Sequence, residues 1–167
     1  MEQRTTGNRE EQLVVFRLGQ EAYGVDIGQV QGIERMQSIT RVPHTPEFVE
    51  GVINLRGQVT PVIMLRTRFG LESTEHTRET RIVVVRMKDA DAGVGLVVDA
   101  VEGVLRISSD QVEPLSELVA SVEAEYLRGI ARIEDKLLIL LDLEKILTWQ
   151  EARALQNADL VETPVSA

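Results

Sequence analysis

The sequence contains no cysteine, few aromatic residues and no long apolar run. The absence of cysteine excludes disulfides, thiolate metal ligands and a cysteine nucleophile. The longest apolar run, Leu137 to Leu141, is far shorter than the roughly 20 residues that a membrane helix needs. The N-terminal residues MEQRTTGNREE lack the apolar core of a signal peptide. These absences predict a cytoplasmic protein that reaches a membrane only through a partner.

Basic residues are also scarce relative to acidic ones, 18 against 27, which gives a net charge of -9. A nucleic-acid-binding surface needs clustered Lys and Arg to neutralise phosphates. Aromatic residues, which stack on bases and sugars, make up only 4% of the chain. A barrel of the oligonucleotide/oligosaccharide-binding type that takes sugars or nucleic acid is therefore a disfavoured alternative.

Side chains that could form a metal site are few and dispersed. His44 and His76 lie in polar loop segments without a nearby nucleophile or a metal-ligand spacing. Asp89 and Asp91 match the start of a calcium loop, but Ala100 stands where such a loop needs a Glu. A solvated turn is the favoured interpretation of this segment. We expect neither a metal nor a cofactor.

Asp142 and Glu144 are the closest approach to a paired-carboxylate site. No general-acid partner or polar cluster converges on them in the sequence, and we interpret them as the acidic start of a helix. An enzyme with an unrecognised carboxylate site is the second disfavoured alternative.

An internal repeat dominates the sequence. Residues 48–65, FVEGVINLRGQVTPVIML, match residues 126–143, YLRGIARIEDKLLILLDL, at an offset of 78. Upstream, residues 13–36 match residues 82–107, with the run VQGI at 30–33 aligned on VEGV at 101–104. A repeat of this extent indicates one β-rich unit of about 70 residues used twice in tandem.

Short β-branched and aromatic runs, separated by turns every 8 to 12 residues or so, predict small barrels rather than a parallel α/β sheet. The pattern predicts hairpins around residues 19–21, 56–57 and 134–135, one or two helical turns within 28–35, and helices over 117–124 and 144–156. Pro61 cannot donate to a ladder, so it predicts an edge position or a bulge for the strand over 59–65.

Polar chemistry concentrates at one predicted hairpin. Asn54 and Arg56 precede Gly57, which can take positive φ, so the Arg56 guanidinium should project from the tip. Such an arginine is either a docking group or a solvated turn residue. The sequence leaves a similar choice for the apolar residues Val14, Ile27 and Val30, which could belong either to the core or to a partner-binding surface.

Four sequence blocks carry a resemblance. The run FVEGVINLRGQVTPVIMLRTRFGL, preceded by LGQEAYGVDIGQVQGI and followed by VGLVVDAVEGVLRI and YLRGIARIEDKLLILLDLEKIL, closely resembles the CheW family of bacterial chemotaxis coupling proteins. The match covers about residues 11 to 150 in the right order and spacing. It implies a mainly β fold of two tandem, intertwined, small five-stranded β-barrels of SH3-like type, with short helices and a C-terminal helix.

The expected organisation follows the resemblance. It assigns residues 1–11 to a disordered N-terminus, 12–150 to a CheW-like domain with barrels at about 12–79 and 80–143, 144–156 to the C-terminal helix, and 157–167 to a flexible tail.

The resemblance also implies a function. It predicts a non-catalytic adaptor that couples the cytoplasmic tips of transmembrane chemoreceptors to the regulatory domain of the histidine kinase CheA. Such a protein is cytoplasmic, is recruited to membrane-associated receptor arrays, and neither binds nucleic acid nor inserts into the membrane. The same fold serves other chemosensory pathways, such as control of type IV pili, and this alternative stays open.

Residue roles carry over by position in the matching motifs. The implied receptor-binding residues are Val30, Gly51, Asn54, Arg56 and Gly57. The implied kinase-binding residues are Val14, Ile27 and Val30. Many family members have a Glu two residues after the position of Val30, where this chain has Gly32 and places Glu34 two residues further on.

Overall fold

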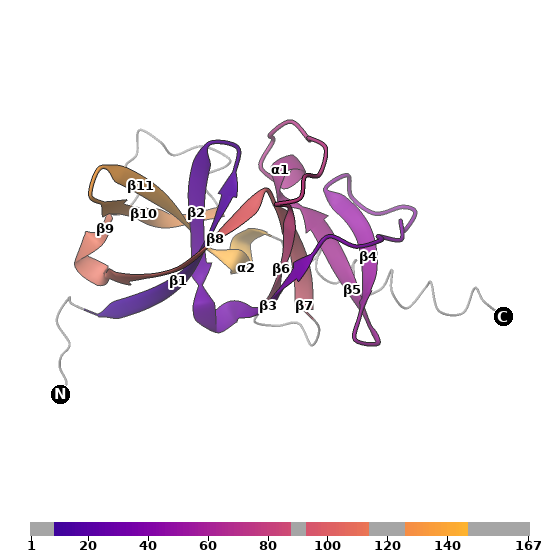
Figure 1. The fold of residues 1–167 in the computed structure, drawn as a ribbon, viewed down its shortest axis with the longest axis horizontal. Helices are drawn as coiled ribbons and strands as arrows, with labels where there is room; N and C mark the ends of the chain where they lie inside the picture. The colour runs from indigo at the N-terminus through magenta and orange to yellow at the C-terminus, as the bar shows by residue number, and fades with distance from the viewer. Residues whose placement is uncertain (1–8, 88–92, 114–125, 147–167) are drawn as a thin grey trace.

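The computed structural model describes residues 9–87, 93–113 and 126–146, which form two β-sheets side by side along the long axis (Figure 1). The six-stranded sheet has the spatial order β8 (Ala100–Ser108), β1 (Glu10–Leu18), β2 (Glu21–Asp26), β11 (Lys136–Leu141), β10 (Leu127–Ile133) and β9 (Val112–Glu113). The five-stranded sheet has the order β3 (Val30–Arg35), β6 (Arg81–Arg86), β7 (Gly93–Val98), β5 (Gln58–Met64) and β4 (Val49–Leu55). The mainly β class with two small intertwined barrels is confirmed, and the short β9 gives one of them a sixth strand.

Antiparallel hairpins form where the turn residues predict them. β1 pairs with β2 around residues 19–20, β4 with β5 around 56–57, and β10 with β11 around 134–135. The prediction of helical turns over 28–35 is wrong in part, because only η2 (Ile27–Gln29) is helical and β3 follows it directly. Pairing with β6 supplies the backbone partners that make this segment a strand.

The two repeats exchange strands. β3 pairs with β6 and β8 pairs with β1, both antiparallel, while β5 runs parallel to β7 and β11 runs parallel to β2. The five-stranded sheet is therefore built from strands within residues 30–98. The six-stranded sheet takes strands from 10–26 and from 100–141. The boundaries of the two barrels are thus intertwined, as the resemblance implies, and the division near residue 80 is only approximate.

Pro61 lies inside the five-stranded sheet, because β5 stands between β4 and β7. The predicted edge position is therefore wrong. A bulge does occur next to Pro61, but on the partner strand: the register of the β4–β5 ladder shifts between Val49 and Gly51, opposite Ile63 and Val62. The parallel ladder to β7 begins at Val62, so the missing N–H of Pro61 lies just outside that ladder.

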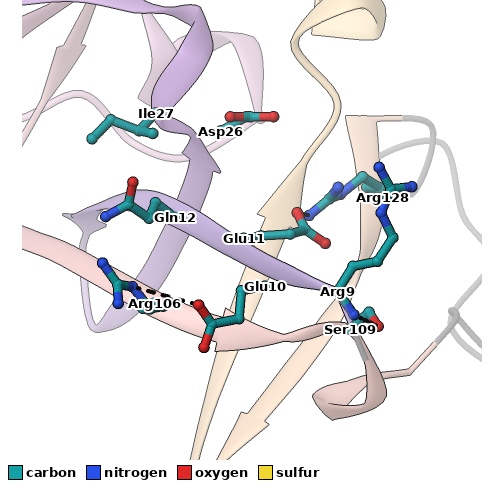
Figure 2. A pocket seen from close by; sticks show the side chains of 9 residues that line it. All are labelled: Arg9, Glu10, Glu11, Gln12, Asp26, Ile27, Arg106, Ser109 and Arg128. Atoms are coloured by element: carbon teal, nitrogen blue, oxygen red, sulfur yellow. Dashed lines mark hydrogen bonds and ion pairs between the residues drawn. The ribbon is translucent and has the colours of Figure 1, made fainter. Parts of the chain in front are cut away.

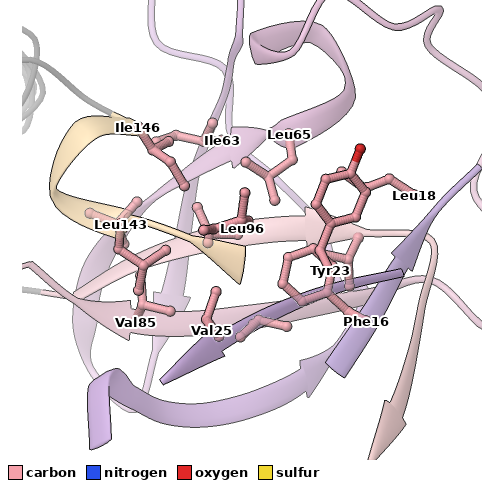
Figure 3. Close-up of a cluster of buried hydrophobic side chains, with 14 of the residues drawn as sticks. Phe16, Leu18, Tyr23, Val25, Ile63, Leu65, Val85, Leu96, Leu143 and Ile146 are labelled. Carbon is pink, nitrogen blue, oxygen red and sulfur yellow. The ribbon is translucent and has the colours of Figure 1, made fainter. Parts of the chain in front are cut away.

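Three hydrophobic clusters form the core. The largest lies between the sheets, where α2 (Leu143–Ile146) packs against side chains from both (Figure 3). It contains Phe16 and Val25 from the six-stranded sheet and Ile63 and Leu96 from the five-stranded sheet. Each sheet also has a smaller cluster of its own. The shared cluster ties the two barrels into one folding core.

A second contact between the repeats runs through α1 (Leu65–Arg68), which follows β5 as α2 follows β11. The rings of Tyr23, Phe69 and Tyr126 lie in series with centroids 5.8 and 5.5 Å apart. The Arg68 guanidinium lies over the rings of Phe48 and Tyr126, and its Nε donates a 2.6 Å hydrogen bond to the carbonyl oxygen of Ile146. Arg68 therefore connects the α1 and α2 ends of the two repeats.

Several predictions concern residues outside the described ranges. These are residues 1–8 of the N-terminus expected to be disordered, Asp89 and Asp91, the helix over 117–124, the C-terminal helix beyond residue 146, and the tail over 157–167. Glu10 and Glu11, the last residues of that expected N-terminal segment, instead begin β1, where they pair with β8. Within the described ranges, no helix has the length and apolar character needed to cross a bilayer.

Candidate functional site

The β4–β5 turn presents Arg56 at its tip. Arg56 and Gly57 have φ of 51° and 85°, and positive φ at both central residues is what a two-residue type I′ hairpin requires. The backbone N–H of Gly57 donates a 2.9 Å hydrogen bond to Oδ1 of Asn54, which holds the turn closed. The Arg56 side chain is 77% exposed, as the sequence predicted for a projecting guanidinium.

Arg56 also reaches the opposite edge of its own sheet. Its NH2 group donates to Oε2 of Glu34 on β3 at 3.2 Å. Because β3 and β4 are the two edge strands of the five-stranded sheet, this ion pair links its open edges. A small cavity of about 190 Å³ lies at this seam, lined by Gly32 and Leu55 among others.

Glu34 is the site residue that the motif comparison did not assign. Side chains two residues apart on a regular strand share a face, so Glu34 lies on the same face of β3 as Gly32. A register shift between Val30 and Gly32 turns Val30 to the other face, against the shared core. The acid that many family members carry at the position of Gly32 is thus present one pleat further along in this chain. Positions 32 and 34 share a face only if residues 30–35 form a strand. The residue pattern predicted a helical turn there, so it could not identify Glu34 as the equivalent acid.

Gly51 has a structural reason to be glycine. Its φ is 150°, and a Cβ there would stand 2.2 Å from the carbonyl oxygen of Thr40. Thr40 exchanges two backbone hydrogen bonds with Val52, of 2.9 and 2.8 Å, which bring the 36–48 loop against β4. Gly51 is buried beneath this contact, so its effect on receptor binding would be indirect.

Ile27 and Val30 flank η2. Asp26 caps this turn, its Oδ1 accepting a 2.8 Å hydrogen bond from the N–H of Gly28. Ile27 is 36% exposed, whereas Val30 is half-buried against the shared core. Figure 2 shows Ile27 at the border of a polar cavity of about 700 Å³.

Charged side chains in that cavity are largely paired with one another. Arg128 and Glu11 lie 2.8 Å apart, and Arg106 and Glu10 lie 3.9 Å apart. An apolar side chain beside such a polar rim is the arrangement found at protein interfaces.

Val14 does not belong to this surface. It is only 2% exposed and packs in the shared core, with its neighbours on β1 buried as well. Both faces of β1 are covered, because alternate residues enter the shared cluster and the cluster of the six-stranded sheet. Val14 is therefore a core residue. It cannot contact the kinase directly.

The acidic and histidine residues considered as catalytic or metal-binding groups have structural or surface positions. Oδ1 of Asp142 accepts a hydrogen bond from the N–H of Glu144 at the start of α2, as expected for the acidic start of a helix. His44 and His76 are exposed in loops. Across the three described ranges, no group of His, Asp and Glu has the geometry to hold a metal ion.

The partly buried pair of Arg66 and Asp99 serves the fold. Asp99 accepts two hydrogen bonds from Arg66, of 2.9 and 2.6 Å, and one of 2.7 Å from the backbone N–H of Gly19. The hydrogen bonds from Arg66 lower the pKa of Asp99, although partial burial opposes the shift. This pair ties the β1–β2 hairpin to α1 and to the end of β7.

Comparison with known proteins identifies the relatives of this chain. The family model described as a CheW-like domain matches residues 12–151. Two proteins named chemotaxis protein CheW, from Klebsiella aerogenes and Bacillus subtilis, are 36% and 35% identical to it. The first match covers 88% of this chain and 87% of the relative, and the second covers 86% and 91%. The crystal structure of the scaffolding protein TtCheW from Thermoanaerobacter tengcongensis superposes with a TM-score of 0.78 at 37% identity, covering 86% of this chain and 96% of that one. The chain belongs to the CheW family.

Proposed function

We propose that this protein is a non-catalytic chemotaxis adaptor that couples chemoreceptors to the histidine kinase CheA within receptor arrays. Its membership of the CheW family supports the chemotaxis role. The name of its structural relative, a scaffolding protein, supports a role without catalysis.

The observation that carries the proposal is the Arg56 tip. An arginine at positive φ, on a rigid two-residue turn, is held away from the sheet and keeps most of its hydrogen-bonding capacity for a partner. Glu34 orients the guanidinium from one side, which leaves its other donors free to meet acceptors on a receptor helix. Asn54 and Gly57 would act by shaping the turn, and Gly51 by seating the 36–48 loop.

A second surface is proposed for the kinase. Ile27 exposes apolar area at the start of β3, and Val30 supports it from the core side. A partially exposed apolar residue with a charged rim fits a modest contact with the regulatory domain of CheA. Because the two surfaces are separate, one adaptor can hold a receptor and a kinase together. In an array each contact can then be as weak as micromolar, or about -8 kcal/mol, because multivalency raises the effective concentration.

Reconstitution from purified parts tests this proposal. Membranes that contain the chemoreceptors of the source organism, its CheA and this protein are combined, and autophosphorylation of CheA is measured with and without the protein. The proposal predicts strong stimulation that needs all three components. Equal kinase activity in the absence of this protein would contradict it, as would ATP hydrolysis by the protein alone.

The same experiment distinguishes the chemosensory pathways. Receptors and kinases from a motility pathway and from a pathway that controls type IV pili can be supplied separately. We propose the chemotaxis pathway because the named relatives are chemotaxis proteins. Stimulation restricted to the pilus pathway would support the alternative.

A further inference from the structure

The β10–β11 turn borders an apolar pocket in the six-stranded sheet. This tip pocket has a volume of about 330 Å³, and its apolar lining includes Val15, Leu105, Ile133 and Leu137. Leu137 lies at its rim and is 54% exposed. Within the described part of the chain, none of the residues proposed for receptor or kinase contact lines the pocket, so it is a separate surface.

The repeat allows a direct comparison with the Arg56 tip. The offset of 78 places Glu134 at the position of Arg56, and the alignment of VEGV on VQGI places Leu105 at the position of Glu34. In the five-stranded sheet the ion pair of Arg56 and Glu34 crosses the seam above a smaller, polar cavity. In the six-stranded sheet the same two positions cannot pair, and the seam is open and apolar. The fold itself does not require an apolar pocket of this size, since the equivalent seam in the other sheet has only a smaller, polar cavity bridged by an ion pair.

The rim of the tip pocket is acidic. Glu134 and Asp135 form the turn, and neither takes part in an ion pair with another residue of the described ranges. Glu102, also at the rim, already pairs with Arg17 at 3.2 Å. Lys136 is the opposing charge, so the rim next to the apolar floor carries an excess of negative charge.

We infer that the tip pocket docks a segment of another protein that carries a bulky apolar side chain with Arg or Lys beside it. A volume near 330 Å³ lies at the small end of ligand pockets and suits one or two side chains better than a cofactor. The apolar side chain would be buried against Leu105, Ile133 and Leu137. The adjacent cation would meet Glu134 and Asp135, in the way that charged rims select partners at interfaces.

The chain supplies its own matched control variant. Replacing Leu105 by Glu and Glu134 by Arg together copies the ion pair of Glu34 and Arg56 into the equivalent seam. This double variant should close the pocket and also remove the negative charge of Glu134 from its rim, so both features that the peptide is expected to meet are lost together. Leu137→Ser is a second variant, and it spares the core because Leu137 is more than half exposed.

The probe is the fluorescently labelled peptide Gly-Lys-Leu-Leu-Arg-Lys-Gly, titrated with the full chain and followed by anisotropy. One control peptide has both leucines replaced by serine, and another has its basic residues replaced by glutamate. We expect each control peptide to bind about tenfold more weakly, which is the loss expected for one buried apolar side chain or one close charge contact. The closed double variant and Leu137→Ser should each lose a similar factor against the original peptide.

The outcomes separate cleanly. Methyl resonances of Leu105, Ile133 and Leu137 that shift on addition of the peptide would support the inference. It would be overturned if the peptide failed to bind at about 1 mM, or if the serine peptide bound equally well, which would indicate general attraction to an acidic protein. Unchanged binding by the two variants would overturn it too. None of these outcomes depends on the Arg56 tip, so the proposed function and this inference can fail independently.

Discussion

Arg56 and Glu134 occupy the same position in the two repeats, and both have positive φ, of 51° and 54°. A non-glycine residue at positive φ is uncommon, and here the turn geometry requires it twice. The backbone therefore presents a side chain at each tip, and the sequence decides its charge. One tip offers a cation that is paired with Glu34, and the other offers an anion beside an apolar pocket. The duplicated fold thus presents two tips of different chemistry.

Gly51 should be much more sensitive to substitution than Gly57. In Gly51→Ala the new Cβ would collide with the Thr40 carbonyl oxygen, so we expect a loss of at least about 3 kcal/mol in the free energy of unfolding. Gly57→Ala meets no atom within 4 Å and should cost only the left-handed conformation, about 1 kcal/mol. Denaturant unfolding of both variants measures the difference. Equal losses would contradict the packing of the 36–48 loop on β4.

Ile27 and Val14 should respond oppositely to a charge. Ile27→Asp places the carboxylate at a partly exposed position, so the protein should fold and its complex with CheA should weaken by about 2 kcal/mol or more. Val14→Asp buries a carboxylate in the shared core and should abolish folding. Circular dichroism and a CheA binding titration measure the two effects. If Ile27→Asp unfolded the protein, Ile27 would have to be assigned to the core instead of the binding surface. If Val14→Asp folded normally, the burial of Val14 would be contradicted.

Glu34 should matter for coupling more than for stability. Its pair with Arg56 is exposed on the Arg56 side, so Glu34→Gln should change the free energy of unfolding by less than about 0.5 kcal/mol. Receptor-dependent stimulation of CheA should nevertheless fall, because the guanidinium loses the group that orients it. A double-mutant cycle with Arg56→Ala tests this role. Fully additive effects of the two changes on stimulation would contradict it.

The stability of the protein should depend on Asp99 at low pH. Hydrogen bonds from Arg66 lower the pKa of Asp99 in the folded state, so the folded protein holds this proton less tightly than the unfolded chain. The stabilisation is complete above the ordinary Asp pKa near 4 and is lost as the pH falls toward the lowered value. Asp99→Asn should cost about 1 to 2 kcal/mol at pH 7 and flatten the decline below about pH 4.

Urea unfolding at a series of pH values measures both effects. An Asp99→Asn variant with the same acid profile as the unchanged protein would show that Asp99 does not carry this dependence. Arg66→Gln, which removes the charged partner, should produce a similar flattening and serves as the matched variant.

The sequence was sufficient to predict the repeat, the hairpins and the Arg56 tip, because each has a strong local signal. Gly57 after Arg56 marks the turn, and alternating apolar residues mark the strands on either side. Val30 and Ile33 are spaced as on a helix, yet pairing with β6 makes their segment a strand. Local spacing cannot reveal that a distant strand is available, so this prediction failed.

For a similar reason the residue pattern alone did not show the strand exchange, and only the family resemblance implied intertwined barrels. Internal repeats show which segments are alike, but not whether β1 pairs within its own repeat or with β8 of the other. The burial of Val14 follows from that exchange, since β8 and β2 flank β1 and the shared core covers it. The open apolar seam at Leu105 and Glu134 likewise becomes visible only once the two tips can be compared in space.

Charge reversal at Arg56 tests the central claim most directly. In Arg56→Glu the changed side chain lies at an exposed position of the turn, so the thermal midpoint should be nearly unchanged and the fold stability should shift by less than about 1 kcal/mol. Binding to CheA alone should also be nearly normal, because Ile27 and Val30 are unaltered. Receptor-stimulated autophosphorylation of CheA, measured on the same preparation, should be lost. Full stimulation by a folded, kinase-binding Arg56→Glu protein would contradict the account and make Arg56 a solvated turn residue.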